Sequence, residues 1–140
     1  MEKATKLLRI SYWAGAIADG LAAMAMLEQA ILARPSPLSG YVPEIPYRYA
    51  MALAGSLMLG WTALLIWADR HPYERRGVLV ITIPVVFGLA SSGLFAVAFG
   101  FIPLNRMLPL LLFQALLVLL FASSLLSSKK STESIGKRGA

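Results

Sequence analysis

Residues 61–80, WTALLIWADRHPYERRGVLV, decide how this chain folds. An apolar run ends at Trp67, a charged segment follows from Asp69 to Arg76, and the chain becomes apolar again after Gly77. The runs on either side extend far enough to cross a bilayer, which takes about 20 residues. The pattern therefore predicts a short polar elbow between two membrane-spanning helices.

The composition of the whole chain is typical of a membrane protein. Of its 140 residues, 58% are hydrophobic and only 14% are charged, and the mean hydropathy is +0.69. A soluble domain needs more polar side chains to cover its surface. At about 20 residues per span, the length leaves room for roughly four spans and short loops, but for no additional soluble domain.

Working outward from the elbow, the sequence predicts four spans and a tail. The expected spans are residues 10–33, 49–68, 78–101 and 108–126, in one transmembrane domain over residues 1–128. Residues 34–47, RPSPLSGYVPEIPY, contain four prolines and are expected to form an irregular loop. Residues 129–140 are small, polar and basic, which predicts a disordered tail. The basic N-terminus is also compatible with a signal peptide, but Asp19 interrupts its apolar segment, so we interpret that segment as the first span.

The distribution of Lys and Arg predicts the orientation of the spans. Ten of the 13 basic residues lie at the two termini and in the elbow, where Arg70, Arg75 and Arg76 are the topology anchors. Loops rich in Lys and Arg favour the cytoplasmic side. We therefore expect an all-α, up-down-up-down four-helix bundle in the cell (inner) membrane, with both termini cytoplasmic. Orientation also explains the net charge of +6, so no nucleic-acid partner is expected.

Small residues at four-residue spacing predict which helix faces pack together, because membrane helices associate where small side chains allow close approach. Three spans carry such rows: Ala14, Ala18 and Ala22; Ala52, Ser56 and Gly60; and Gly88, Ser92, Ala96 and Gly100. The fourth span is mostly leucine and has no such row. We expect it to lie at the periphery with broad lipid contact.

Asp19 is the most informative polar residue within the spans. Counted from Arg9 at 1.5 Å per residue, it lies about 15 Å from the cytoplasmic boundary, near the middle of the bilayer. An ionised carboxylate there costs at least a few kcal/mol, so we expect it to be protonated, hydrated or paired. Ser56, Ser92 and Gln114 lie about 18 to 21 Å from the same boundary. The sequence is thus compatible with one polar layer across all four helices.

Two interpretations of this carboxylate stay open at this point: a group for ligand binding or proton coupling, and a structural hydrogen bond between helices. The sequence shows no nucleophile with an attendant base, no paired carboxylates at one depth and no metal-ligand spacing. We therefore expect no catalytic residue, metal or cofactor. Glu28, near the outer end of its span, is expected to reach the interface or to pair with Arg34 or Arg48.

Two known families share features with this chain. Residues 60–82, GWTALLIWADRHPYERRGVLVIT, together with four spans, resemble a group of small uncharacterised prokaryotic membrane proteins; the resemblance implies the four-span layout and no activity. Residues 15–27, GAIADGLAAMAML, are similar in character to the first span of the small multidrug resistance exporters, four-span proteins with one membrane-embedded carboxylate. That family uses Glu where Asp19 stands here, and it has shorter loops and less charge bias.

The leading functional hypothesis is a non-catalytic membrane protein whose mid-bilayer polar layer binds a lipid-like ligand or a partner membrane protein. The costly Asp19, without catalytic companions, motivates it. The alternative is a proton-coupled small-molecule transporter that acts as a homodimer, with Asp19 as the coupling carboxylate. The expected partners are accordingly the lipid bilayer, a hydrophobic small molecule, and a second copy or another membrane protein.

Overall fold

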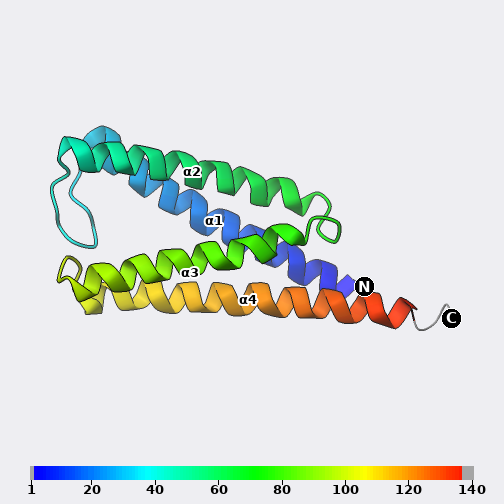
Figure 1. The fold of residues 1–140 in the computed structure, drawn as a ribbon. Helices are drawn as coiled ribbons and strands as arrows, with labels where there is room; N and C mark the ends of the chain where they lie inside the picture. The colour runs from blue at the N-terminus through cyan, green and yellow to red at the C-terminus, as the bar shows by residue number, and fades with distance from the viewer. Residues whose placement is uncertain (1, 137–140) are drawn as a thin grey trace.

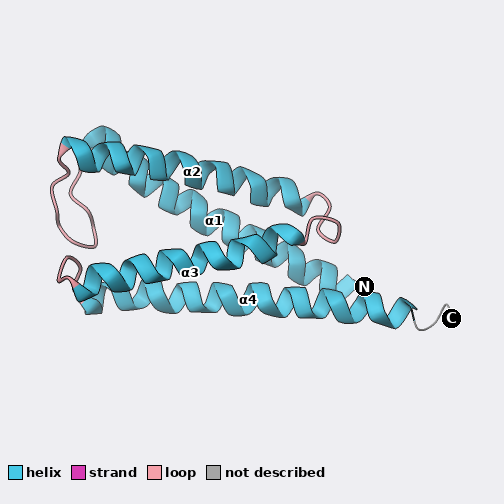
Figure 2. Ribbon diagram, viewed as in Figure 1, coloured by secondary structure: helices cyan, strands magenta, loops and turns pink. Residues whose placement is uncertain are grey.

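A computed structural model describes residues 2–136 of the chain, with side chains described up to Lys129. Four helices follow one another: α1 (Glu2–Leu32), α2 (Ile45–Asp69), α3 (Gly77–Ala98) and α4 (Leu104–Gly136). Figure 2 shows that loops alone connect them in this part of the chain. Each helix is long and apolar enough to cross a membrane. The predicted all-α fold with four candidate spans is thereby confirmed.

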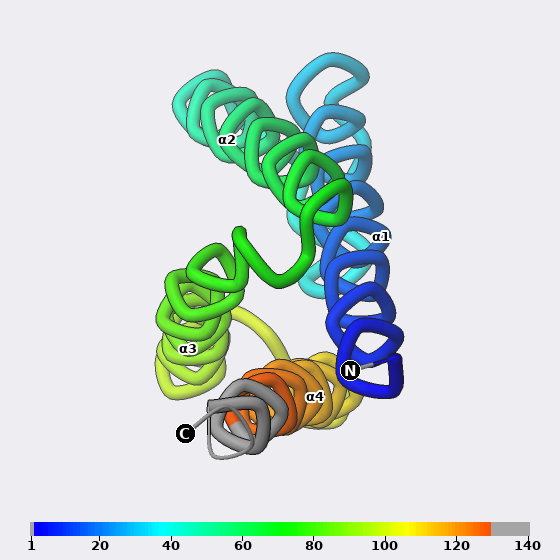
Figure 3. Tube along the Cα trace, turned by 90° about the vertical axis from the view of Figure 1, so that its right-hand side faces the viewer, coloured from blue at the N-terminus to red at the C-terminus, as the bar shows by residue number. Residues whose placement is uncertain are grey.

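The helices pack in the order α2, α1, α4, α3, which differs from their order along the chain. α1 packs along α2 and crosses α4, α4 packs along α3, and α2 meets α3 at few points (Figure 3). Figure 1 places the N-terminus and the connection of residues 70–76 at one end of the molecule, called the elbow end here. The loop of residues 33–44 and the turn of residues 99–103 lie at the opposite end, called the loop end.

A packed core lies at the elbow end. It contains buried side chains from all four helices: Leu8, Tyr12, Ala16, Leu65, Ala68, Val78, Leu79, Val86, Leu117 and Phe121. At Gly15 an added Cβ would lie 3.0 Å from Leu65 Cδ1 and 3.2 Å from Phe121 Cζ, so the absence of a side chain lets α1 approach α2 and α4 together. The expectation that the fourth span is peripheral is therefore wrong. Its bulky Leu117 and Phe121 fill the space that the small residues of α1 leave.

The small-residue rows predicted in the second and third spans do not mark packed faces. An added Cβ at Gly60 or Gly88 would meet no described atom within 4 Å. The close approach of α2 occurs at Gly55 instead, where an added Cβ would lie 2.9 Å from Leu27 Cγ of α1. Four-residue spacing identifies a smooth face, but it does not tell which face a neighbouring helix covers.

Two helix boundaries differ from the predicted spans for local reasons. α2 begins at Ile45 because Pro46 lies in its first turn, where the missing N–H of proline has no partner to lose. α3 ends at Ala98 because Gly100 adopts a φ of 70°. The N–H of Gly100 donates to the Val97 carbonyl and that of Phe101 to the Ala96 carbonyl, which closes the helix in a Schellman motif.

α4 begins earlier and ends later than the predicted fourth span. The carbonyl of Pro103 accepts the N–H groups of Arg106 and Met107, which starts the helix at Leu104. α4 then continues to Gly136, whereas the sequence predicted a disordered tail from residue 129. No proline or glycine interrupts residues 127–135, and extending an established helix costs little. Residues 137–140 of the predicted tail lie outside the described residues.

The proline-rich loop crosses the loop end of the molecule (Figure 1). The ring centroid of Tyr41 lies 5.2 Å from that of Tyr47 in α2 and 5.8 Å from that of Phe101 in the α3–α4 turn. Arg106 Nη1 donates to the Leu38 carbonyl at 3.3 Å. The loop therefore forms a roof that links the α1–α2 pair to the α3–α4 pair.

The other two arginines of the loop end have contacts with α1. Arg48 donates to the carbonyls of Ala30 and Ile31 at 2.8 and 3.1 Å, so it caps the last turn of that helix. Arg34 lies 3.7 Å from the Glu28 carboxylate, and both side chains are largely exposed. The predicted pairing of Glu28 is confirmed, with Arg34 as the partner.

Candidate ligand-binding site

The four residues of the predicted polar layer are not joined by hydrogen bonds. The Ser56 hydroxyl donates to the Ala52 carbonyl at 2.8 Å, and the Ser92 hydroxyl donates to the Gly88 carbonyl at 2.9 Å. Both serines are exposed on the outside of the bundle. A serine in a membrane helix commonly satisfies its hydroxyl on its own backbone in this way. These two residues therefore lie outside any interior site.

Asp19 and Gln114 lie on helix faces that point into the bundle. Asp19 follows Gly15 by one helical turn, and Gly15 is the point at which α1 meets both Leu65 and Phe121. Gln114 precedes Phe121 by two turns and shares its face of α4. Asp19 is half-buried, and Gln114 is buried. The structure thus brings two of the four predicted residues to inward faces.

Neither of these two side chains has a polar partner within the described chain. The Asp19 carboxylate makes no hydrogen bond or ion pair with a described residue. The Oε1 atom of Gln114 is buried and likewise has no hydrogen-bond partner there. Unpaired polar groups are costly in hydrocarbon. Both residues are therefore candidates to contact a ligand, a water molecule or a proton.

The predicted topology anchors lie at the ends of α2 and α3. Arg70 is the C-cap residue of α2, and Arg76 is the N-cap residue of α3. The guanidinium of Arg75 stacks 3.5 Å from the ring centroid of Trp67 and donates to the Trp67 carbonyl at 2.5 Å. This cation–π contact holds the elbow against α2. The role of these arginines in orientation stays a prediction.

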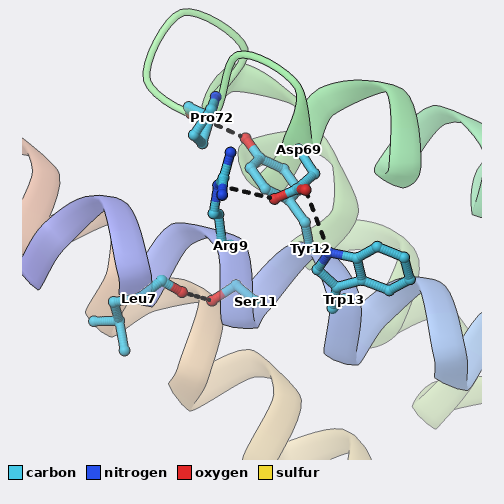
Figure 4. A network of polar contacts seen from close by, with 7 residues as sticks. All are labelled: Leu7, Arg9, Ser11, Tyr12, Trp13, Asp69 and Pro72. Carbon is cyan, nitrogen blue, oxygen red and sulfur yellow. Dashed lines mark hydrogen bonds and ion pairs between the residues drawn. The ribbon is translucent and has the colours of Figure 1, made fainter. Parts of the chain in front are cut away.

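Asp69 joins the elbow to α1, a role that sequence analysis missed (Figure 4). One of its carboxylate oxygens accepts from Trp13 Nε1 at 3.2 Å, and the other lies 3.7 Å from Arg9 Nε. The Tyr12 hydroxyl donates to the carbonyl of Pro72 at 3.3 Å. Trp13 and Asp69 are 56 residues apart, so no local pattern links them. The signal available in the sequence was the carboxylate of Asp69 at the elbow end of the second span and the indole of Trp13 near the elbow end of the first.

A second polar contact joins α1 to α4 at the elbow end. The Oγ atoms of Ser11 and Ser124 lie 2.5 Å apart, and both residues are fully buried. Both hydroxyls also reach the Leu7 carbonyl, at 3.0 and 3.2 Å. Figure 4 shows the Leu7–Ser11 contact in α1. Together with Gly15, this contact holds the two helices close at one crossing point.

Beyond this crossing point α1 and α4 separate toward the loop end (Figure 3), and an apolar groove lies between them. One cavity of about 530 Å³ is lined by Ala14, Ala18 and Ala22 of α1 and by Leu110 and Phe113 of α4, among others. A second cavity of about 310 Å³ continues the first, because it shares Ala22 and Leu110 with it. The predicted small-residue row of the first span thus lines a groove.

The polar groups of this groove are concentrated beneath the roof loop. Gln29 lines the second cavity, and its Oε1 accepts from the Tyr47 hydroxyl at 3.1 Å while its Nε2 donates to the Ala25 carbonyl at 3.2 Å. Ser36 of the loop lies in the same wall. From Ala14 to Gln29 the groove follows about 22 Å of α1. It is therefore apolar along its length and polar at its loop end.

No protein-family model, curated protein or solved structure matches this chain. Among residues 2–136, as far as they are described, no group of three or more His, Asp or Glu side chains is placed to hold a metal ion. The groove and the inward polar residues are therefore the features from which a function is inferred.

Proposed function

We propose that this chain is a non-catalytic multi-pass membrane protein that holds a lipid-like molecule in the groove between α1 and α4. One observation carries this proposal: two apolar cavities share Ala22 and Leu110 and end at the polar pair of Gln29 and Tyr47. A lipid has the same division into a long apolar body and a polar end. The site thus runs from Ala14, past the level of Asp19, to Gln29 at the loop end.

Selectivity in such a groove comes from shape and from the polar end. Lipid tails outside the protein are as apolar as the groove, so hydrophobic exclusion contributes little to the choice of occupant. The crossing point at Gly15 closes the groove at one end, and the roof loop covers the other. A bound molecule therefore needs a chain that fits between them and a head group that can exchange hydrogen bonds with Tyr47 or Gln29.

Retention of lipid during purification tests this proposal. The Ala22→Phe variant places a ring where the two cavities join, and we expect it to lower the lipid retained per chain in native mass spectrometry by about tenfold, the loss for roughly 1.4 kcal/mol. Ala63→Phe is the matched control, because Ala63 is exposed on α2. The proposal fails if wild-type protein carries no lipid, or if Ala22→Phe retains as much as Ala63→Phe.

The same proposal includes an up-down-up-down arrangement in the inner membrane, with both termini and the elbow in the cytoplasm. The excess of Lys and Arg at the elbow end supports it. The groove would then admit its ligand from the outer leaflet. The chain contains no cysteine, so single-cysteine variants report its sidedness directly.

A membrane-impermeant maleimide distinguishes the two orientations in intact cells. We expect it to label Ser39→Cys in the roof loop and to label Glu74→Cys in the elbow only after the membrane is broken. Labelling of Glu74→Cys in intact cells, with Ser39→Cys protected, would reverse the assignment.

Asp19 supports a second candidate function, a proton-coupled small-molecule transporter acting as a homodimer. The supporting observation is a half-buried carboxylate without a polar partner among the described residues. In proteoliposomes, Asp19→Asn should abolish substrate uptake driven by a pH gradient while the protein stays folded. Glu28→Gln is the control, because this carboxylate pairs with Arg34 near the surface. Uptake that survives Asp19→Asn removes this candidate.

A further inference from the structure

The charged side chains of the loop end make their contacts outside the groove between α1 and α4. Among the described residues, those that line the two cavities of the groove are all uncharged. Arg48 caps the last turn of α1, and Arg106 donates to a carbonyl of the roof loop. Arg34 pairs with Glu28, and Glu44 is exposed at the start of α2. A molecule in the groove therefore meets no fixed charge of the described residues.

Neutral groups form the polar end of the groove. Gln29 and Tyr47 both line the second cavity. Nε2 of Gln29 carries two hydrogens and donates one of them to the Ala25 carbonyl. The Tyr47 hydroxyl donates its hydrogen to Gln29 Oε1 and keeps lone pairs that can accept. The pair can therefore both donate and accept a further hydrogen bond, which suits a hydroxyl, ester or amide group.

A charged head group would be costly at this end. Ser36, Pro37 and Leu38 of the roof loop form part of the wall of the second cavity, so a head group that reaches Gln29 lies beneath the loop. An ion that leaves water needs an opposite charge beside it. No cation of the described residues lines this cavity. A phosphate there would have hydrogen-bond partners but no counter-charge.

We propose that the groove selects lipids with an uncharged head group, such as a monoacylglycerol, over phospholipids with the same acyl chain. This selection rests on the proposed function and adds to it the chemical class of the ligand. The acyl chain lies against the small residues of α1, and the glycerol hydroxyl groups exchange hydrogen bonds with Gln29 and Tyr47. The charge of the head group thus decides which lipid is held.

Two matched lipids test the selection on the full-length protein. A monoacylglycerol and the lysophosphatidic acid with the same acyl chain differ only by the phosphate. Native mass spectrometry with equal concentrations of both should show at least about tenfold more bound monoacylglycerol, because the phosphate has no cation to pair with. Ala22→Phe should reduce this binding, since its ring fills the place where the two cavities join.

A cation added to the wall of the second cavity should reverse the preference. Leu38→Arg gives the phosphate a partner, and we expect it to lower the preference for the monoacylglycerol by about tenfold, the effect of one charge-assisted hydrogen bond. Met51→Lys places a cation in the same wall from α2 and serves if Leu38→Arg does not fold. Val42→Arg is the matched control, because it adds the same charge to the same loop at a side chain that is 65% exposed and outside the cavity lining.

The outcomes separate this selection from the lipid-holding function itself. Equal binding of the two lipids by wild-type protein, lost for both in Ala22→Phe, would overturn the selection and leave the groove as a lipid site. A preference that both Leu38→Arg and Met51→Lys leave unchanged would likewise overturn the selection alone. Binding that Ala22→Phe leaves intact, or no binding of either lipid, would overturn the selection and the proposed function together.

Discussion

The elbow end and the loop end of this protein are held together in different ways. At the elbow end, side chains from all four helices form one core, and Phe121 of α4 is fully buried within it. At the loop end, the helices pack as two pairs joined by the roof loop, and Phe113 of the same α4 is 45% exposed. The packed core and the groove are therefore separated along the axis of the bundle. If the two ends differ in this way, substitutions at the elbow end should cost more stability than substitutions at the loop end.

Removal of the two phenylalanines of α4 gives the largest contrast. Phe121→Ala should lower the free energy of unfolding by about 3 kcal/mol or more, because it leaves a cavity where three helices meet. Phe113→Ala should lower it by less than about 1 kcal/mol, because lipid already contacts this ring and can replace it. Denaturation in detergent micelles, followed by circular dichroism, measures both. Equal losses of unfolding free energy would mean that the core at the elbow end contributes no more to stability than the packing at the loop end.

The contact of Asp69 with α1 should give the next largest effect. Asp69→Ala removes the acceptor of Trp13 and the charge that faces Arg9, and a hydrogen bond to a charged group contributes about 1.5 to 3 kcal/mol. We expect a loss near the lower value, because the Arg9 side chain is largely exposed. Glu74→Gln is the control in the same elbow, since its pair with His71 is exposed. A similar loss in both variants would assign the effect to elbow charge in general.

The serine contact between α1 and α4 should have a smaller effect. In a double-mutant cycle, Ser11→Ala and Ser124→Ala should show a coupling energy of about 0.6 kcal/mol, the average for hydrogen bonds between membrane helices. Ser92→Ala provides a reference, because this exposed hydroxyl donates only to its own helix. Additive effects of the two elbow-end substitutions would show that their close approach contributes no interaction energy.

The smallest effect on stability is expected at the loop end. Arg106→Gln weakens the link between α4 and the Leu38 carbonyl, but this contact is exposed and should contribute less than about 0.5 kcal/mol to unfolding. Hydrogen exchange of residues 36–42 should nevertheless become faster, because the roof loop loses an attachment. Arg34→Gln is the comparison, since that side chain pairs with Glu28 instead. Unchanged exchange in Arg106→Gln would mean that the aromatic contacts of Tyr41 hold the roof alone.

The number of helices could be predicted from the sequence because each span has a local signal in its apolar length. The packing of the helices could not, since it depends on contacts between distant residues. No feature of the sequence distinguishes Gly15 from Gly60. Nevertheless, Gly15 lies at the crossing of three helices, whereas Gly60 faces open space. The place of α4 between α1 and α3 follows from Phe121 meeting Gly15, a pairing that no periodicity within either span reveals.

The candidate site was predictable in part for the same reason. Depth along each helix follows from residue counting, so Asp19 and Gln114 could be singled out as polar residues at one level. Counting does not tell which side chains face inward, and Ser56 and Ser92, at a similar depth, are exposed and donate to their own helices. The groove itself arises where α1 and α4 diverge. The divergence begins beyond the Ser11–Ser124 contact, which joins residues 113 positions apart.

The same distance has a consequence for how the protein is made. Because the chain is synthesised from its N-terminus, α1 and α2 can pair through Leu27 and Gly55 while the rest of the protein is still on the ribosome. On α1, Ser11 acquires its partner Ser124 only after α4, the fourth of the described helices, has been translated. Closure of the elbow-end core therefore follows the pairing of α1 with α2, and it brings the two walls of the groove together.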